Sequence, residues 1–406
     1  MQPYSERTTG QASQTGELLP PGRLRIMVVS VHPPYGGGSA HSSKELALGL
    51  RRLGHDVLHV APYNHDREES LAQEEGLHWI KADFPWNELS ISAEAQASMD
   101  ADLQAVYRKY GPFDYVILGR ETFVWHMHAI REVHAGPVML IVRGAYINRL
   151  AGNTNETIDP QLKEQLVGLY READVIVCIA RHLVKSINKV IFDDDLERAR
   201  TAFIPNPIEL PAYDAPSQMR WQPGQTIRLA MAAQIKGRKK PLDAVEIVRE
   251  LRDRGADVEL TVYGDGPDMP RMRALIERYG LEKQVVLRGH VTRAEVLEGF
   301  SRAETVLLCS DNEGWPRVLQ EAIAAGKGVV AYDNIGSREV LKEWITPWAL
   351  GRLVPIGDFK GAADAVADLA HVLRSSNEPI PPPDLPNSLA VLREYEYTLR
   401  HLDSHL

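Results

Sequence analysis

This 406-residue chain has few cysteines, no excess of basic residues and no long apolar run. Its two cysteines, Cys178 and Cys309, lie inside the apolar runs VIVCIA and TVLLCS. This placement predicts buried thiols and excludes a disulfide framework or a cysteine-based zinc cluster. The formal charge of −9 argues against a general nucleic-acid binder, because such proteins carry a basic excess. No apolar run approaches the roughly 20 residues of a membrane span.

The start of the chain is polar and lacks the apolar region of a signal peptide. We therefore expect a flexible tail at residues 1–22 on a cytoplasmic protein. Hydrophobic residues at 44% and charged residues at 25% are typical of soluble globular proteins. A chain of this length predicts two domains.

From Arg23 onward, short apolar runs alternate with amphipathic stretches. A helix is expected from about Ser39 to Leu53, with Gly54 ending it. Continuous apolar strands between helices indicate a parallel sheet that is covered on both faces. The first series of strands, predicted as one domain over residues 23–206, has runs at 24–31, 56–62, 115–119, 138–144, 174–180 and 201–206.

A Pro-rich linker predicted at residues 207–222 precedes a second series of strands. This second domain is predicted over residues 223–385, with runs at 226–234, 258–266, 284–290, 305–311, 326–333 and 351–358. A terminal helix within residues 386–406 is expected to pack back on the first domain. The predicted class is α/β, with two doubly wound, Rossmann-like domains that face each other across a cleft.

Three turns at the ends of predicted strands have compositions that suit anion binding. Glycines at 36–38 would let backbone N–H groups approach a ligand at a helix N-terminus. GDGP (264–267) follows a strand, and KGRKKP (236–241) supplies four basic residues that would neutralise phosphate. Each turn also has a structural interpretation: a tight turn, a chain reversal and a solvated basic surface.

The segment SDNEGWPRVLQEAIAAGKGVV (310–330) holds two glutamates eight positions apart. Glu313 lies in the loop after a buried strand, and Glu321 lies about one and a half turns into the following helix. Their separation, on the order of 10 Å, matches the reach from a sugar across a diphosphate to a ribose. Carboxylates accept hydrogen bonds from diols, and the helix N-terminus favours phosphate. A surface glutamate and an unrelated helix glutamate remain the alternative.

Together these segments resemble the retaining glycosyltransferases of family GT4, which have the GT-B fold. EGWPRVLQEAIAAGKGVV is similar to the family's E-x7-E motif, and the likeness extends from Arg23 to about residue 372. The other matching pieces are PPYGGGSAHSSKELALGLRRLGHDV, EADVIVCIARHL, IPNPIEL, VYGDGPDM, VVLRGHV, SRAETVLLCSDNEGWP and GRLVPIGD.

The resemblance implies that the second domain holds a nucleotide-sugar donor and that the first holds most of the acceptor. It implies that Glu321 binds the ribose, that Glu313 binds the sugar hydroxyls and that Lys239 binds the diphosphate. No cofactor or metal is required by the implied mechanism. The donor side is expected to comprise Gly37, Gly38, Arg238, Lys239, Glu313, Gly314, Trp315, Pro316, Arg317, Val318 and Glu321.

Two positions depart from the family pattern. The family has an arginine five or six residues before the diphosphate lysine, where this chain has Ala233 and Gln234. Lys236 and Arg238 are both candidates to supply the missing charge. The family also has a histidine where Arg143 ends the strand VMLIV, and an arginine cannot act as a general base. We expect Arg143 to serve catalysis by anchoring an anionic donor or acceptor group.

The acceptor side is expected to include Arg143 together with His32, Arg120 and Glu121, which follow predicted strands. An ordinary loop histidine and a structural ion pair are the alternatives. His126 and His128 diverge on a helix, so no metal site is predicted there. Arg181, Lys185 and Lys189 repeat at helical spacing. We interpret them as a solvated stripe, with phosphate or membrane-surface contact as the alternative.

The sequence therefore favours a cytoplasmic, retaining, hexosyltransferase-type enzyme that moves a sugar from a UDP-, GDP- or other nucleoside-diphosphate sugar to a polar hydroxyl acceptor. A GT-B sugar-nucleotide epimerase, a phosphorylase and a non-catalytic sugar-nucleotide-binding module are the alternatives. The partners expected are these two substrates and no nucleic acid. The sequence gives neither the base nor the acceptor nor the oligomeric state.

Overall fold

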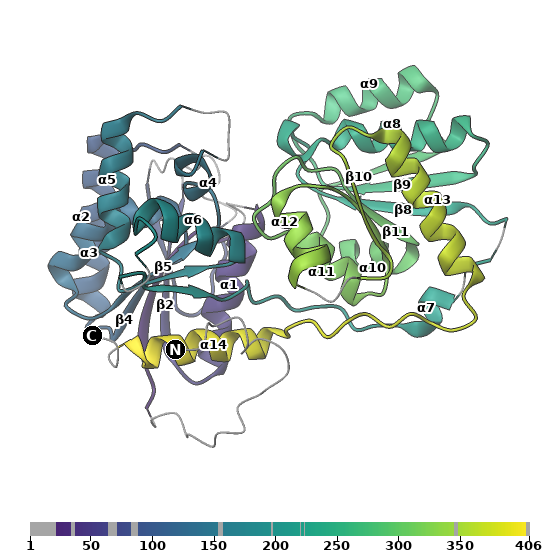
Figure 1. Cartoon of the computed structure of the whole chain (residues 1–406). Helices are drawn as coiled ribbons and strands as arrows, with labels where there is room; N and C mark the ends of the chain where they lie inside the picture. Colours follow the sequence, from purple (N-terminus) through teal and green to yellow (C-terminus); the bar gives the residue numbers. More distant parts are fainter. Residues whose placement is uncertain are drawn as a thin grey trace.

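The structure is a computed structural model that describes residues 22–33, 37–63, 71–82, 88–152, 157–195, 198–219, 221–222, 224–344 and 348–402. The predicted tail at 1–21 and Gly36 of the glycine turn lie outside these ranges. The chain forms two α/β domains side by side (Figure 1).

The first domain is built on a parallel sheet whose described strands follow the order β3-β2-β1-β4-β5-β6-β7. The strands are β1 (Arg25–Val29), β2 (Asp56–Tyr63), β3 (Leu77–Lys81), β4 (Tyr115–Leu118), β5 (Val138–Val142), β6 (Val175–Cys178) and β7 (Thr201–Phe203). Its helical segments are α1 (Gly37–Arg52), α2 (Ala93–Tyr110), η3 (Glu121–His126), α3 (Met127–Val133), α4 (Ile147–Leu150), α5 (Pro160–Arg171) and α6 (Arg181–Ile191). Helix α7 (Ala215–Met219) follows on the way to the second domain.

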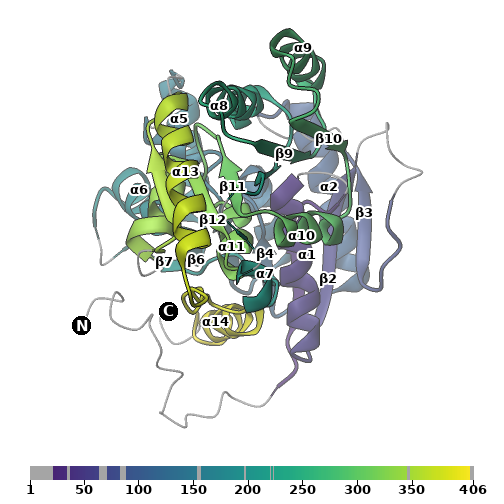
Figure 2. The same ribbon diagram turned by 90° about the vertical axis from the view of Figure 1, so that its right-hand side faces the viewer.

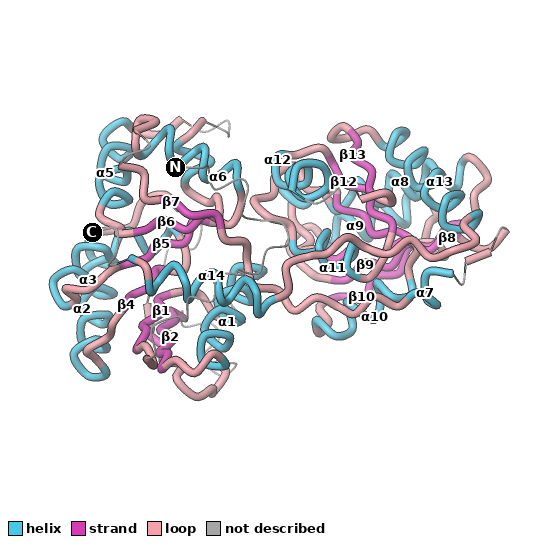
Figure 3. The backbone as a smooth tube through the Cα atoms, turned by 60° about the horizontal axis from the view of Figure 1, so that its bottom comes forward, coloured by secondary structure: helices cyan, strands magenta, loops and turns pink. Residues whose placement is uncertain are grey.

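The second domain repeats this plan with the strand order β10-β9-β8-β11-β12-β13. The strands are β8 (Ile227–Ala232), β9 (Val258–Tyr263), β10 (Val285–Gly289), β11 (Thr305–Leu308), β12 (Gly328–Tyr332) and β13 (Gly351–Val354). The helical segments are η4 (Gly237–Lys239), α8 (Pro241–Asp253), α9 (Met269–Tyr279), α10 (Arg293–Arg302), α11 (Arg317–Ala324), α12 (Ile335–Arg338), the π-helical turn η5 (Glu339–Trp344) and α13 (Phe359–Ser375). Figures 2 and 3 show the strands of each domain enclosed by helices.

Both sheets reverse their order of growth at one place, between β1 and β4 in the first and between β8 and β11 in the second. The central strands are buried on both faces, as their continuous apolar sequences predict; Ile26 to Val29 of β1 are fully inaccessible to solvent. Loops that leave the carboxyl ends of strands at such a reversal diverge and leave room for a ligand. The prediction of two doubly wound domains is confirmed.

Some element boundaries differ from the sequence prediction. Helix α1 begins at Gly37, two residues before the predicted start. Strand β7 ends at Phe203, because Pro205 lies within the predicted run and Pro207 follows it directly. Strand β3 was not predicted, since LHWIK is short and mixed in polarity. It lies at the edge of the sheet, where it pairs with β2 alone. Both cysteines are buried and free, as predicted.

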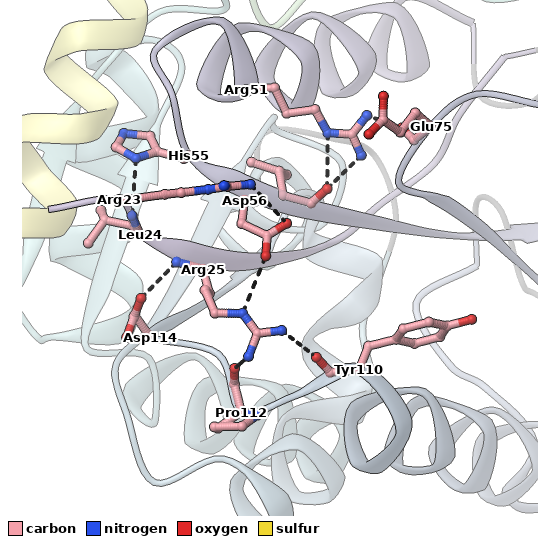
Figure 4. A network of polar contacts seen from close by, with 11 residues as sticks. Arg23, Leu24, Arg25, Arg51, His55, Asp56, Glu75, Tyr110, Pro112 and Asp114 are labelled. Atoms are coloured by element: carbon pink, nitrogen blue, oxygen red, sulfur yellow. Dashed lines mark hydrogen bonds and ion pairs between the residues drawn. The ribbon is translucent and has the colours of Figure 1, made fainter.

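Polar contacts fix the amino ends of the first-domain strands (Figure 4). The guanidinium of Arg25 on β1 donates to the carbonyls of Pro112 at 2.6 Å and Tyr110 at 2.7 Å, and to Asp56 of β2 at 3.3 Å. The backbone N–H of Arg25 also donates to Asp114 at 2.7 Å. One side chain therefore ties β1 to β2 and to the turn before β4, at the edge opposite to the strands' carboxyl ends.

The last helix, α14 (Ser388–Arg400), crosses back beneath the first domain (Figure 1). Its buried face includes Leu392, which packs against Gly49 of α1, and Tyr395. Glu396 lies 3.3 Å from His55, and Arg400 donates to the carbonyl of Gly22 at 2.8 Å. The end of the chain is thus part of the first domain.

Replacement of Leu392 by alanine should destabilise the first domain by about 2–5 kcal/mol, because it leaves a cavity between α14 and α1. Leu389 on the same helix is 49% exposed, so Leu389→Ala should change stability by no more than about 0.5 kcal/mol. Scanning calorimetry of both variants measures the effect. Equal melting curves for the two would show that α14 does not contribute to the core.

Candidate active site at the domain interface

The candidate residues follow the strands at the two reversal points. Gly37 and Gly38 begin α1 after β1, and Arg120 follows β4. In the second domain, Lys239 lies in η4 after β8, and Glu313 lies in the loop after β11. The topology therefore brings residues that are far apart in sequence to two facing sheet edges.

The two domains contact each other near the carboxyl ends of these strands. Gly314 lies against the backbone carbonyl of Arg143, so close that an added Cβ would come within 2.7 Å of that oxygen. The rings of Phe203 and Trp315 meet edge to face at 6.0 Å. Arg317 at the start of α11 donates to Ser42 of α1 at 3.2 Å. The loop that contains the first glutamate is thus held against the first domain.

Glu313 and Lys239 form an ion pair through Oε1 and Nζ. Both side chains are largely buried, which strengthens the attraction relative to a surface pair. The interaction joins the loop after β8 to the loop after β11. Of the basic residues in the turn, this lysine is therefore the one that the structure pairs with the first glutamate.

Glu321 lies on the buried face of α11, and its Oε1 accepts a hydrogen bond from Arg293 at 2.6 Å. Arg317 lies 3.7 Å from the same oxygen. Arg293 also donates to the carbonyl of Glu209 in the linker at 2.6 Å. The second glutamate is thus connected to the segment that joins the domains.

The start of α11 faces α1 across the interface. Pro316 precedes the helix, and no side chain of that cap position accepts from the first N–H groups. Gly38 lies opposite, because a Cβ on it would be 4.0 Å from Cδ of Arg317. Val318 in the first turn is half-buried and Trp315 is buried. This arrangement brings two helix N-termini, each favourable for anions, to one place.

Arg238 contacts the loop that leads to Glu313. It is exposed, its guanidinium donates to the carbonyl of Asn312 at 2.6 Å, and its own carbonyl accepts from Asp311 at 3.2 Å. The side chain thus braces the loop that precedes Glu313, and its expected role in donor binding stays a prediction.

Glu121 is fully buried and does not line an acceptor surface, which corrects the sequence prediction. Its carboxylate accepts from the backbone N–H groups of Arg143, Ala145, Tyr146 and Ile147 at 2.7–3.0 Å, and from the hydroxyl of Tyr170 at 3.3 Å. A single charge thus holds the whole turn between β5 and α4.

The guanidinium of Arg143 is held inside the first domain. It donates to the carbonyl of Gly119 at 2.9 Å, to Asn206 Oδ1 and to Ser43 Oγ at 3.4 Å. Burial lowers its pKa to about 10, so it stays protonated at neutral pH. The backbone carbonyl of Arg143 contacts Gly314 of the second domain, and the expected role of its guanidinium as an anchor for an anionic group stays a prediction.

His32 and Arg120 lie at the carboxyl ends of β1 and β4. His32 is buried, with Nδ1 2.8 Å from the carbonyl of Pro33 and Nε2 3.5 Å from Glu74. Burial lowers its pKa. Burial likewise lowers the pKa of Arg120, which is 9% exposed.

The structure also shows the surroundings of the histidine pair and of the basic stripe noted in the sequence. His126 bonds Asp100 at 2.6 Å and His128 bonds Glu172 at 2.6 Å, so the two histidines diverge. Among the described residues no group of three or more His, Cys, Asp and Glu is placed to hold a metal. Lys185 and Lys189 are exposed on α6, as a solvated stripe predicts. In the described part of the chain, no helix combines the length and apolar character needed to cross a membrane.

Two interface residues were not identified from the sequence. Arg293 lies in the first turn of α10, and only its position after a strand and before a helix marks it. Glu339 of η5 accepts from the N–H groups of Arg181 and His182 and from His182 Nδ1 at 2.6 Å. A second-domain carboxylate therefore caps first-domain helix α6, a pairing that sequence spacing cannot reveal.

Comparison with known proteins shows what this chain is similar to. The family described as glycosyl transferases group 1 matches residues 220–376, which span the second domain. Colanic acid biosynthesis glycosyltransferase WcaL of Escherichia coli, itself named as putative, is 30% identical over 194 residues, 44% of each chain. The second domain is therefore similar to the group 1 glycosyl transferases, and the chain as a whole has the two-domain GT-B fold.

Solved structures share the two-domain fold of this chain. Sucrose-phosphate synthase of Thermosynechococcus elongatus aligns with a TM-score of 0.69 and 16% identity, over 94% of this chain and 98% of that one. Anabaena HepE in complex with UDP and glucose aligns with a TM-score of 0.64 and 15% identity, over 94% and 98%. The sequence matches are shorter: the chain spans less than half the length of the curated relatives it matches.

Replacement of Glu121 by glutamine should destabilise the first domain of this GT-B protein by about 2–4 kcal/mol. The carboxamide carries less charge and turns one N–H group toward backbone donors that then lack an acceptor. Glu164→Gln on the exposed side of α5 is the control. Chemical denaturation compares the two, and equal stability would show that the turn does not depend on the Glu121 charge.

Domain closure should depend on pH through Glu339. Burial alone would raise the pKa of Glu339, but the hydrogen bonds from His182 and from the backbone of Arg181 and His182 outweigh it and lower the pKa. A lowered pKa in the closed state means that closure is favoured above the ordinary glutamate pKa, and is lost as pH falls through the lowered value.

Small-angle scattering should therefore show a larger radius of gyration for the wild type as the pH falls below about 4.3, the ordinary glutamate pKa. Glu339→Gln should already be expanded at neutral pH, whereas Glu378→Gln, at an exposed position, should match the wild type. A Glu339→Gln curve identical to the wild type at every pH would contradict a role for this carboxylate in closure.

Proposed function

We propose that this chain is a retaining glycosyltransferase of the hexosyltransferase type, which moves a sugar from a nucleoside-diphosphate sugar to an acceptor hydroxyl. The observation that carries the proposal is the joint placement of Lys239, Glu313, Glu321 and the N-terminus of α11 opposite the glycine turn of the first domain. The group 1 family match over the same domain supports it.

The donor is proposed to lie along α11. Glu321 is the acceptor for the ribose hydroxyls, and its Oε1 is already fixed by Arg293. Glu313 receives the hydroxyls of the donor sugar. The diphosphate lies between them, against Lys239 and the first N–H groups of α11, where fixed positive charge is concentrated. The donor thereby bridges the two glutamates.

The chemistry proposed is a displacement on one face of the sugar. The bond from the anomeric carbon to the leaving phosphate oxygen breaks, and the bond from that carbon to the acceptor oxygen forms on the same side. The acceptor's proton passes to the departing phosphate oxygen, so the protein supplies no nucleophile. Lys239 and the helix N-terminus stabilise the charge that develops on the leaving group.

Closure of the two domains supplies the orientation that such a reaction needs. The contacts of Gly314 with Arg143 and of Arg317 with Ser42 bring the donor loop against the first domain. Held reactants react faster than free ones because their relative motion is already restricted. The interface is thus proposed to be both the substrate site and the closing surface.

The donor base and the acceptor are proposed only by class. The HepE structure that shares the fold contains UDP and glucose, and WcaL is named for colanic acid biosynthesis. A UDP- or GDP-sugar and a polar, hydroxyl-bearing acceptor are accordingly proposed, with the work done in the cytoplasm. The family matches name glycosyltransferases and favour neither an epimerase nor a binding module.

Replacement of Lys239 by alanine should lower kcat/KM by about 10²–10³-fold, because the leaving group loses its fixed positive partner. Glu313→Ala should lower it similarly through the sugar, and Lys360→Ala at an exposed site should not change it. Donor hydrolysis and transfer are measured with UDP-, GDP-, ADP- and TDP-sugars, and NMR gives the product anomer. Inversion would exclude the retaining mechanism, and no turnover with any donor would remove the transferase proposal.

A further inference from the structure

Glu321, to which the proposed function assigns the ribose, is held through one of its two oxygens. The side chain is buried on α11, where Nη1 of Arg293 donates to Oε1 at 2.6 Å and Nε of Arg317 lies 3.7 Å from the same oxygen. Oε2 accepts no hydrogen bond from the residues that the structure describes. An ionised carboxylate accepts hydrogen bonds on both oxygens. Oε2 is therefore the oxygen that is left for the hydroxyls of a ligand.

The way in which helix α10 begins directs Arg293 toward Glu321. Arg293 is the first residue of α10, directly after the N-cap Thr292. Thr292 Oγ1 accepts from the N–H of Glu295 at 3.3 Å, and the carboxylate of Glu295 accepts from the N–H and the hydroxyl of Thr292 at 2.9 and 2.8 Å. This capping box fixes the backbone at Arg293 and occupies the first acidic side chain of its own helix. The carboxylate that pairs with Arg293 accordingly lies on α11.

The other arm of Arg293 contacts the segment between the domains. Its Nη2 donates to the backbone carbonyl of Glu209 at 2.6 Å. The side chain of Glu209 in turn accepts from Nη1 of Arg52 at 3.1 Å, at the end of α1 in the first domain. One planar guanidinium thus joins α11 to the linker. Two short hydrogen bonds from one rigid plane define its orientation, because a rotation that improves one bond weakens the other.

The charge of Arg293 also suits the ligand. Glu321 alone would repel the diphosphate that the proposed function places beside it. With Arg293 and Arg317 close to its Oε1, the group of three side chains has two positive charges and one negative charge. This charge acts equally on nucleotides with and without ribose hydroxyls. A comparison of such nucleotides therefore reports the orientation of the carboxylate and not its charge.

We propose that Arg293 is a positioning residue of the donor site, which turns Oε2 of Glu321 toward the ribose hydroxyls and so makes the protein select ribonucleotides over nucleotides that lack these hydroxyls. The hydrogen bond to the linker fixes the guanidinium in the orientation that this role needs. The inference rests on the proposed function, in which Glu321 binds the ribose, and adds a residue that acts through Glu321 without touching the substrate.

The test measures what the ribose hydroxyls add to binding. Calorimetric titrations of the full chain compare UDP with 2′,3′-dideoxy-UDP and GDP with 2′,3′-dideoxy-GDP. The wild type should bind the ribonucleotide about 10- to 100-fold more tightly, which is the value of hydrogen bonds to a charged group. Arg293→Met should reduce this affinity ratio about 10-fold, because the carboxylate is then free to turn. Arg293→Lys should reduce it too, since a flexible ammonium group keeps the charge but not the two-armed geometry.

The same helix supplies the matched control. Arg302 on α10 has a side chain that is 71% exposed and pairs with Glu298, so Arg302→Met should leave the ratio unchanged. Glu321→Ala should abolish the preference for ribose. Arg293→Met added to Glu321→Ala should lower the ratio no further, because both residues act through one carboxylate. Circular dichroism and melting curves without ligand confirm that each variant is folded.

The outcomes separate the two proposals. If neither UDP nor GDP binds the wild type, the proposed function itself fails. If they bind without any preference for ribose, the assignment of Glu321 fails and this inference fails with it. If Glu321→Ala loses the preference but Arg293→Met keeps the wild-type ratio, the inference is overturned while the proposed function stands. A wild-type ratio in Arg293→Lys would overturn the two-armed orientation.

Discussion

The constraint on which this structure depends is that parallel strands deliver their loops to one edge. Each sheet has a single reversal of strand order. Segments that follow β1 and β5 in the first domain meet the segment that follows β11 in the second, although they are far apart along the chain. The remaining features, including the fixed turn at Glu121 and the network at Arg25, keep these edges in place.

Much of this arrangement was predictable because it follows from local patterns. Apolar strands between amphipathic stretches predicted both sheets, and the segment from Ser310 to Val330 predicted a strand, a loop and a helix. Those three elements fix where Glu313 and Glu321 lie. The placement required no knowledge of distant contacts, since the two glutamates stand only eight positions apart on one continuous stretch of backbone.

The sequence did not predict the contacts of a side chain whose partner is far away along the chain. Glu121 follows a strand as a ligand-binding residue would, but its partners are N–H groups of residues 143–147, which only the pairing of β4 with β5 brings near. The partners of Arg143 were not identified for the same reason, because Asn206 and Ser43 reach it only through three-dimensional packing. A carboxylate that binds backbone and one that binds substrate have the same one-letter code.

The route of the chain has a mechanical consequence. The polypeptide enters the second domain through the segment after β7 and returns after α13 to finish as α14 on the first domain (Figure 1). Two backbone segments therefore cross between the domains and form a double connection. We expect such a double connection to allow bending more readily than twisting, since twisting would stretch one crossing segment against the other. In the order of the chain, the second domain is an insert between two parts of the first.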